Sequence, residues 1–360
     1  MLVNGRPYRS IWFDSDVQEV QIIDQTLLPH HFEIRSVQSL ADMAEAIRAM
    51  RVRGAPLIGV SAAFGLYLAL RENPVDLDTP IAILIATRPT AVNLAWAMNA
   101  ARLLLSGLPV AERAQGALQF ALQLAEQDVA TCEAIGTQGC NLLEQLWQAR
   151  GATSEPLQIL THCNAGWLAT VDWGTALSVI YKAQARGIPL HVWVDETRPR
   201  NQGAFLTTWE LQQQGIDNTL IADNTGGHLM QHGLVDLCLV GSDRTTASGD
   251  VCNKIGTYLK ALAARDNNIP FYVALPVSTI DFELHDGVRE IPIEQRDADE
   301  VLRMTGLDAD GVRRTISLSH IDARAGNYSF DVTPARLVTA LITEQGVIPA
   351  EAAAIATLKP

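Results

Sequence analysis

Apolar runs of strand length recur through the second half of the chain, and amphipathic stretches with a helical period separate most of them. The apolar runs cover residues 157–161, 190–194, 219–222, 235–240 and 271–275. Helical stretches between them include residues 170–186 and 203–214. Strands and helices that alternate at this spacing are typical of βαβ units. The pattern predicts an α/β fold with a Rossmann-like, doubly wound, mostly parallel sheet.

The first part of the chain carries a different pattern. Short alternating segments predict a small antiparallel sheet over residues 11–13, 20–23 and 32–34. Helical periodicity then begins at Ser39, where Asp42 is placed to complete a capping box. Further helices are predicted over residues 56–67, 89–105, 110–128 and 132–148, the first two opened by prolines.

Residues 149–156 have the composition of a linker. We therefore predict a smaller, mainly helical N-terminal domain with a short antiparallel sheet over residues 1–148, and a Rossmann-like catalytic domain over residues 149–360. A last helix is expected over residues 331–344, opened by Asp331-Val-Thr-Pro334.

Composition and charge narrow the class of partner. The chain has 360 residues, 48% of them hydrophobic, and a formal net charge of −13 at pH 7. Nucleic acids and anionic membranes need a basic face, so we expect neither as a partner. A small phosphorylated metabolite needs only a local cluster of hydrogen-bond donors, so it remains a possible partner. No apolar run reaches the length of a membrane span, and no signal core follows residues 1–10, so a cytoplasmic protein is expected.

The cysteines are odd in number and form no C-x-x-C pair. We therefore expect neither a zinc site nor a disulfide framework. They are Cys132, Cys140, Cys163, Cys238 and Cys252.

Polar residues follow each predicted strand. These clusters are His162-Cys-Asn-Ala-Gly166, Asp195-Glu-Thr-Arg198, Asp223-Asn-Thr-Gly-Gly227, Ser242-Asp-Arg244 and Pro276-Val-Ser-Thr279. A single cluster is explained by the fact that loops after strands are exposed to solvent and therefore polar. Five of them at the carboxyl edge of one parallel sheet indicate a ligand site there.

Two of these strand ends carry candidate catalytic groups. Cys163 is expected in a tight turn into a helix, where the helix dipole would stabilise a thiolate and make it a base or nucleophile; a buried cysteine is more often a small hydrophobe. Asp243 is a candidate general acid or base if burial raises its pKa, although it could simply cap the next helix. Asn253 and Lys254 stand just ahead of the apolar run 255–262, a position that suits donors to ligand hydroxyls, although they could form an ordinary solvated helix start.

Arginines stand before two predicted helices. Arg51-Val-Arg53-Gly54-Ala55-Pro56 precedes one, and Thr87-Arg88-Pro89-Thr90 precedes the next. A helix N-terminus and a guanidinium both bind phosphate, and Gly54 and Ala55 permit close approach, although ordinary surface arginines remain an alternative. The chain contains neither a P-loop nor a strand-linked G-x-G-x-x-G, so a small monophosphate fits better than a nucleotide.

Several of these motifs together resemble the methylthioribose-1-phosphate isomerase family. They are Arg53-Gly-Ala-Pro56, Arg88-Pro-Thr90, Thr161-His-Cys-Asn164, Asp195-Glu-Thr-Arg-Pro-Arg-Asn-Gln-Gly203, Gly241-Ser-Asp-Arg244 and Asn253-Lys-Ile-Gly-Thr257. The resemblance spans nearly the whole chain in motif order. It implies an aldose–ketose isomerase of methionine salvage, which converts S-methyl-5-thio-ribose 1-phosphate to S-methyl-5-thio-ribulose 1-phosphate without a metal or organic cofactor, as a homodimer.

The resemblance also implies roles for single residues. Cys163 and Asp243 match the catalytic pair. The residues that match substrate-binding positions are Arg53, Gly54, Ala55, Arg88, Gln202, Asn253 and Lys254. One loop departs from the family pattern, since Asn224-Thr-Gly-Gly227 and His228 replace an Asn-Met-Ala type turn. This change is expected to alter the pocket around position 5 of the sugar, so 5-deoxyribose 1-phosphate is a second candidate substrate.

Three other functions compete with this one. A ribose 1,5-bisphosphate isomerase would need further basic residues near position 5, and none is assigned. A non-catalytic regulatory protein that binds a sugar phosphate or nucleotide shares the expected fold, but the retained Cys163 and Asp243 favour an enzyme. A dehydrogenase is disfavoured because the glycine fingerprint is missing.

Overall fold

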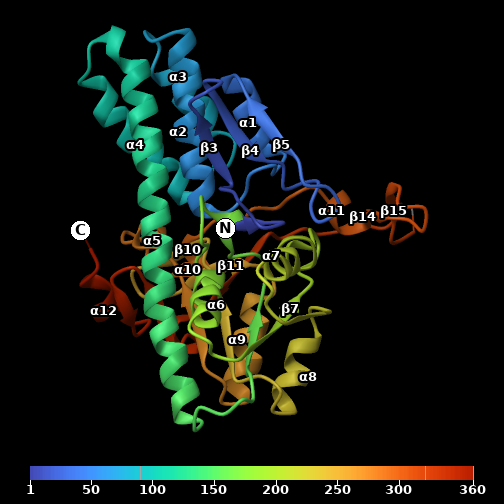
Figure 1. The fold of residues 1–360 in the computed structure, drawn as a ribbon. Coiled ribbons are helices and arrows are strands. Elements are labelled where there is room, and N and C mark those ends of the chain that lie inside the picture. Colours follow the sequence, from blue (N-terminus) through green and yellow to red (C-terminus); the bar gives the residue numbers. More distant parts are fainter. Residues whose placement is uncertain (90, 321, 360) are drawn as a thin grey trace.

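The computed structural model describes residues 1–89, 91–320 and 322–359. In Figure 1, helices and a small sheet form the upper part of the molecule, and a larger sheet with flanking helices forms the lower part. The long helix α5 (Arg113–Ala149) runs beside both parts. No helix within these ranges combines the length and the apolar character that crossing a bilayer requires.

The predicted N-terminal sheet is confirmed. Its strands β3 (Ile11–Asp14), β4 (Glu19–Ile23) and β5 (Ile34–Val37) pair antiparallel, the third starting later than expected. The capping box between Ser39 and Asp42 is present at the start of α1. The other elements before α5 are β1 (Leu2–Val3), β2 (Arg6–Pro7), α1 (Leu40–Arg48), α2 (Ala55–Glu72), α3 (Asp78–Ile85) and α4 (Val92–Ser106).

The helix predictions need correction in this part. The two helices expected over residues 110–128 and 132–148 are one helix, α5, of 37 residues. Asp128 does not break it, because its carboxylate accepts the backbone N–H of Val171 at 2.7 Å instead of competing for its own helix. The helix expected from Pro89 begins at Val92, and α3 was not predicted. Thr90 lies outside the described residues.

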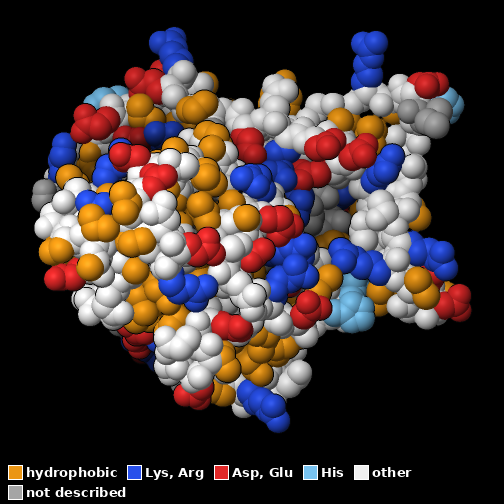
Figure 2. Space-filling model, turned by 90° about the horizontal axis from the view of Figure 1, so that it is seen from above, with side chains coloured by type: hydrophobic (Ala, Val, Ile, Leu, Met, Phe, Trp, Pro, Cys, Tyr) orange, Lys and Arg blue, Asp and Glu red, His pale blue; other side chains and the backbone are white. Residues whose placement is uncertain are grey.

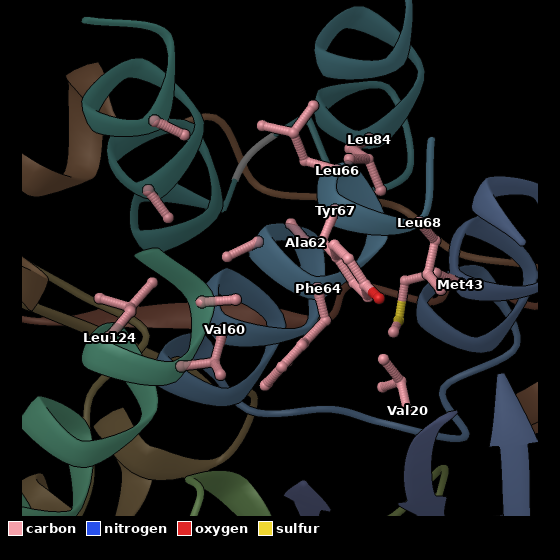
Figure 3. Packing of buried hydrophobic residues seen from close by; sticks show 14 of the residues in the cluster. Val20, Met43, Val60, Ala62, Phe64, Leu66, Tyr67, Leu68, Leu84 and Leu124 are labelled. Atoms are coloured by element: carbon pink, nitrogen blue, oxygen red, sulfur yellow. The ribbon is translucent and has the colours of Figure 1, made fainter. Parts of the chain in front are cut away.

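Helix α2 forms the centre of the N-terminal core. Phe64 and Leu68 are fully buried, and each such side chain contributes about 1.5–3 kcal/mol of hydrophobic stabilisation. Figure 3 shows Val60 facing Leu124 of α5, with Leu68 near Met43 of α1 on the other side. Packing from several directions fixes the position of α2 and therefore of the residues at its N-terminus.

The predicted parallel sheet is confirmed. It has seven strands in the order β18-β17-β12-β9-β6-β7-β8, all pairs parallel except β17 with β18. The strands are β6 (Leu157–Thr161), β7 (Leu190–Asp195), β8 (Asn218–Ile221), β9 (Leu237–Val240), β12 (Phe271–Ala274), β17 (Ala340–Thr343) and β18 (Gly346–Ile348). The helices between them are α6 (Ala176–Ala185), α7 (Thr208–Gln213), α8 (Thr225–Gln231) and α9 (Thr257–Asp266).

A second sheet folds over the edge where these parallel strands end. Its order is β13-β10-β11-β16, with β13 (Ile280–Asp281), β10 (Arg244–Thr246), β11 (Val251–Lys254) and β16 (Phe330–Thr333). The hairpin of β14 (Arg303–Leu307) and β15 (Arg313–Ser317) projects from the body at the right of Figure 1. The remaining short helices are α10 (Gly287–Glu290), α11 (Asp299–Leu302) and α12 (Ala352–Ala356).

The helix expected over residues 331–344 is wrong. This segment forms the end of β16, a single turn at Ala335–Leu337 and then β17. Leu341 and Ile342 are buried as β17 pairs with β12 and extends the large sheet. Burial on both faces of a sheet overrides the helical period that the sequence suggests.

Candidate active site

Two adjacent strands bring Cys163 and Asp243 into one pocket. β6 and β9 are parallel neighbours, with Leu160 opposite Cys238 in their register. Cys163 follows β6 and Asp243 follows β9, and both side chains line the same cavity at the carboxyl edge of the sheet. This edge is where ligands bind in doubly wound sheets.

The pocket gathers nearly all the site residues proposed from the sequence. Its wall contains Arg53, Gly54, Ala55, Arg88, Cys163, Gln202, Asp243 and Lys254. Asn253 lines an adjoining cavity that shares Arg53, Gly54, Ala55, Cys163 and Asp243 with it. The N-terminal part therefore supplies the two arginines, and the large sheet supplies the thiol and the carboxyl group.

The backbone around Cys163 is held in an uncommon conformation. Cys163 has φ +64°, and its N–H donates to Thr197 Oγ1 at 2.8 Å, where Thr197 itself has φ +64°. Left-handed backbone at non-glycine residues concentrates at functional sites. The Cys163 thiol contacts Gln202 Oε1 at 3.4 Å, which places this glutamine beside the sulfur.

The expected helix start at Cys163 is wrong. The chain continues through an irregular turn and the single turn Trp167–Ala169, and α6 begins only at Ala176. Burial raises the pKa of the Cys163 thiol, although Arg53 and Lys254 oppose this shift. The direction of this shift is opposite to that of the stabilised thiolate expected from the sequence.

Asp243 has the raised pKa that a general acid needs. Burial raises the pKa of its carboxyl group, and the positive charges of Lys254, Arg53 and Arg88 partly oppose the shift. Lys254 reaches the pocket from β11, not from the helix start that the sequence suggested. The backbone turns from Asp243 into the β10–β11 hairpin, and the Asp243 N–H donates to the Cys252 carbonyl at 3.0 Å.

The two arginines present unused donors to the pocket. The Nε atoms of Arg53 and Arg88 are buried and lack a hydrogen-bond partner among the described residues. Orphaned buried donors are costly, so they indicate an acceptor that binds there. Gly54 is the N-cap of α2 with φ +102°, so the N-terminus of a long helix adds its free N–H groups beside Arg53.

Sequence reasoning missed part of the pocket wall. The additional lining residues are Met50, Ile58, Ala91, Arg244, Cys252, Ile291, Pro292 and Phe330. Lys254 lies over the Phe330 ring, with Nζ 4.6 Å from its centroid. Cys252 stands two residues from Lys254 in β11 and could have been included; Ile291 and Pro292 come from an irregular segment that carries no sequence signal.

The loop at Asn224 does not reach the pocket. Residues 224–228 are absent from the walls of both cavities at the site, and Thr225–Gln231 form α8, which packs beside α9 and β7. The expectation that this loop reshapes the pocket around position 5 is therefore wrong in this structure. Gly226 instead packs against the core, where an added Cβ would lie 2.8 Å from Leu160 Cδ1.

A second cavity opens next to the pocket and shares Met50, Arg53 and Gln202 with it. It lies between the body and the β14–β15 hairpin, and its wall includes Arg303 and Arg313. Figure 2 shows basic and acidic side chains around a hollow between the body and the arm projecting at the right.

A group of potential metal ligands beneath the site already holds a cation. His162, Asp195 and Asp223 place ligand atoms within 4.8 Å of one another. Lys260 occupies this group, with Nζ 3.2 Å from Asp195 Oδ2 and in contact with the Asp223 carbonyl. His162 links Asp195 to the Ile255 carbonyl, at 2.8 Å on each side, so these residues tie the ends of β6 and β7 to the turn after β11.

Comparisons with known proteins identify the family of this chain. Residues 51–350 match the Initiation factor 2 subunit family. Methylthioribose-1-phosphate isomerases from Rhodospirillum rubrum and Methylorubrum populi are 57% and 58% identical to this chain, cover 100% of it, and are themselves covered over 94% and 98% of their lengths. The chain belongs to the methylthioribose-1-phosphate isomerase family.

Solved structures share the fold over almost the whole chain. The 5-methylthioribose 1-phosphate isomerase of Pyrococcus horikoshii has a TM-score of 0.82 and 38% identity, over 98% of this chain and 96% of that one. The A. fulgidus protein described as translation initiation factor eIF-2B, subunit delta, has a TM-score of 0.80 and 38% identity, over 98% and 99%. Structural likeness alone therefore does not separate the two descriptions, whereas the higher identity to members of the methylthioribose-1-phosphate isomerase family does.

Proposed function

We propose that this protein is an aldose–ketose isomerase that converts S-methyl-5-thio-ribose 1-phosphate to S-methyl-5-thio-ribulose 1-phosphate. Its membership of the isomerase family supports this reaction. The observation that carries the proposal is the pairing of a buried thiol and a raised-pKa carboxyl group opposite two arginines with orphaned Nε–H donors. A non-catalytic regulatory protein would not need the first two groups in one cavity.

The binding residues are assigned by the chemistry of the substrate. Arg53, Arg88 and the N-terminus of α2 with Gly54 and Ala55 bind the phosphate, because guanidinium groups and helix N-termini are phosphate donors. Gln202, Asn253 and Lys254 bind the sugar hydroxyls; Gln202 and Asn253 are each 5% exposed, and Lys254 is 8% exposed. Burial strengthens their hydrogen bonds to a ligand because water competes less for these groups.

Asp243 opens the sugar ring in this proposal. The phosphate on C1 prevents spontaneous opening, so an acid must protonate the ring oxygen as its bond to C1 breaks. A raised pKa keeps the Asp243 carboxyl group protonated at higher pH than usual and suits it to this step. The resulting carboxylate can later accept the proton of the 2-hydroxyl group.

Hydrogen then moves from C2 to C1 by one of two routes. In the proton route, Cys163 removes the C2 proton and returns it to C1 through an enediolate, which requires a thiolate. In the hydride route, the hydrogen passes directly from C2 to C1 while the 2-hydroxyl group gives its proton to Asp243 and becomes the ketone. The raised pKa of the Cys163 thiol favours the hydride route, in which Cys163 acts only as a hydrogen-bond donor.

Solvent deuterium separates the two routes. Turnover in D₂O followed by NMR should give a product without deuterium at C1 if hydride moves directly. Incorporation at C1 would establish the proton route and would assign Cys163 as the base. The control is the same product incubated with enzyme-free buffer, which measures exchange outside the site.

The reaction itself is tested with two substrates. We expect kcat/KM to be higher for the methylthio sugar phosphate than for 5-deoxyribose 1-phosphate, by about 10- to 200-fold, the range that small apolar substituents provide. A ratio near one would make the 5-deoxy sugar an equal substrate. Turnover of neither sugar would overturn the isomerase proposal and restore the regulatory alternative.

Three further expectations are proposals of the same kind. The protein acts in the cytoplasm, it forms a homodimer, and it divides into domains at residues 148 and 149. The net charge of −13 supports a partner other than nucleic acid or an anionic membrane. Light scattering of the purified protein tests the dimer, which a monomer mass would exclude.

A further inference from the structure

Glu210 is a buried carboxylate behind the pocket. It stands on α7 and is fully buried, and no lysine, arginine or histidine within the described ranges lies at ion-pair distance from it. Burying a carboxylate without a cation is costly unless hydrogen bonds compensate it. Burial raises the pKa of Glu210, and its hydrogen-bond donors oppose the shift. Such a costly group needs a reason to be present.

Four hydrogen-bond donors surround the Glu210 carboxyl group and oppose the effect of burial on its pKa. Oε1 accepts from Asn164 Nδ2 at 2.8 Å and from the Leu168 N–H at 3.2 Å. Oε2 accepts from the Trp167 N–H and from the Tyr181 hydroxyl, at 2.8 and 2.7 Å. The Asn164 NH₂ group and the two backbone N–H groups can only donate hydrogen bonds. If Glu210 were protonated, its own proton could be accepted only by the Tyr181 hydroxyl.

The first of these contacts leads directly to Arg53. Glu210 and Thr207 orient the Asn164 amide so that its NH₂ group faces them. The amide oxygen of Asn164 then faces the other way and accepts from Arg53 Nη1, and the Asn164 carbonyl accepts from Arg53 Nη2 at 2.9 Å. Both terminal nitrogens of Arg53 thus donate to Asn164, which fixes the orientation of the guanidinium in the pocket wall.

The other contacts of Glu210 support the helix start beside Arg53. The N–H groups of Trp167 and Leu168 that Glu210 accepts belong to the turn Trp167–Ala169. Gly54, the N-cap of α2, packs directly on this turn, where an added Cβ would lie 2.3 Å from the Ala169 carbonyl oxygen. At Gly166 an added Cβ would lie 1.9 Å from Glu210 Oε2, so the chain leaves room for the carboxylate.

We propose that Glu210 is a positioning residue for the anion site. Through Asn164 it fixes the Arg53 guanidinium, and through the turn Trp167–Ala169 it fixes the N-terminus of α2, so one buried carboxylate aligns both phosphate-binding elements. The inference rests on the proposed function only in taking the bound anion as the substrate phosphate. It predicts a defect in phosphate affinity, not in the chemical step.

The test uses Glu210→Ala and Asn164→Ala in the full-length protein. Calorimetry with inorganic phosphate and steady-state kinetics with the sugar phosphate should both show weakening, by about 10- to 100-fold in Kd and in KM, as expected for losing support of a charged hydrogen bond. kcat should change much less. The double variant should be no weaker than the weaker single variant, because both substitutions break the same connection.

Tyr181→Phe is the matched control. It removes a hydrogen bond from the same carboxylate on the side away from Asn164, so it should lower thermal stability while phosphate Kd and KM stay near wild type. The inference is overturned if Glu210→Ala folds with unchanged phosphate affinity, or if Tyr181→Phe weakens phosphate as much. Should Glu210→Ala not fold, unchanged phosphate affinity in Asn164→Ala overturns it. Phosphate binding needs no turnover, so these outcomes stand apart from a failure of the isomerase proposal.

Discussion

Replacing Gly54 by alanine tests how tightly the two halves of the site are packed. Gly54 has φ +102°, and a Cβ there would lie 2.3 Å from the Ala169 carbonyl oxygen and 2.5 Å from Ala169 Cα. The unfavourable backbone costs about 1–3 kcal/mol for alanine, and overpacking against fixed backbone costs about 1–3 kcal/mol more. We expect Gly54→Ala to lower the free energy of unfolding by about 2–6 kcal/mol, a large share of the usual 5–15 kcal/mol.

Urea unfolding measures this loss, and Gly187→Ala supplies the control. Gly187 has φ +78° with nothing within 4 Å of its added Cβ, so alanine there meets only the backbone cost of about 1–2 kcal/mol. The difference between the two variants reports the contact between Gly54 and the turn after β6. If Gly54→Ala is no less stable than Gly187→Ala, the two segments are not packed as described and the architecture of the anion site is wrong.

Four further substitutions test the site and its surroundings. Cys163→Ser and Asp243→Asn should each lower kcat by about 100-fold or more while KM changes little, as expected for groups that act on the reacting atoms; near wild-type rates in both would contradict their assignment. Arg53→Lys should raise KM about tenfold because lysine lacks the guanidinium fork, whereas Arg186→Lys on the surface should not. Burial raises the pKa of Asp128 from 3.8 to about 7, so its proton stabilises the fold fully below pH 3.8 and this contribution is lost as pH rises through 7. The free energy of unfolding, measured in urea at pH 5 and at pH 8, should therefore change less between the two pH values in Asp128→Asn than in wild type. An equal change in both proteins would refute the raised pKa of Asp128.

The large sheet could be predicted because its strands are apolar runs with polar ends. β6 and β9 are buried along their length, which leaves an unambiguous signal in a single sequence. The segment 331–344 failed because its apolar residues fit a helical period as well as a strand, and only the pairing of β17 with β12 decides between them. Asp128 misled the prediction of α5, because its partner, the Val171 N–H, is distant in sequence.

Some features of the site could likewise be predicted from the sequence, and others could not. Cys163 and Asp243 could be placed in one pocket from the order of strands and motifs, because parallel strands share an edge. The protonation state of the Cys163 thiol could not, because it depends on how the backbone continues after β6 and on burial by distant segments. Glu210 gave no signal, since a glutamate in a helical stretch is ordinarily a solvent-facing residue.

The hydrogen-bonded pairing of β6 and β9 has a consequence for how this enzyme tolerates change. The distance between its thiol and its carboxyl group derives from the backbone spacing of two neighbouring strands, about 4.8 Å, and from two short loops. Apolar replacements inside either strand keep that ladder intact and leave the reactive pair in place. Inserting or deleting one residue within β9 shifts its register against β6 and displaces the connection that carries Asp243. The core can thus drift in composition over evolutionary time, while the lengths of these two strands and their loops cannot.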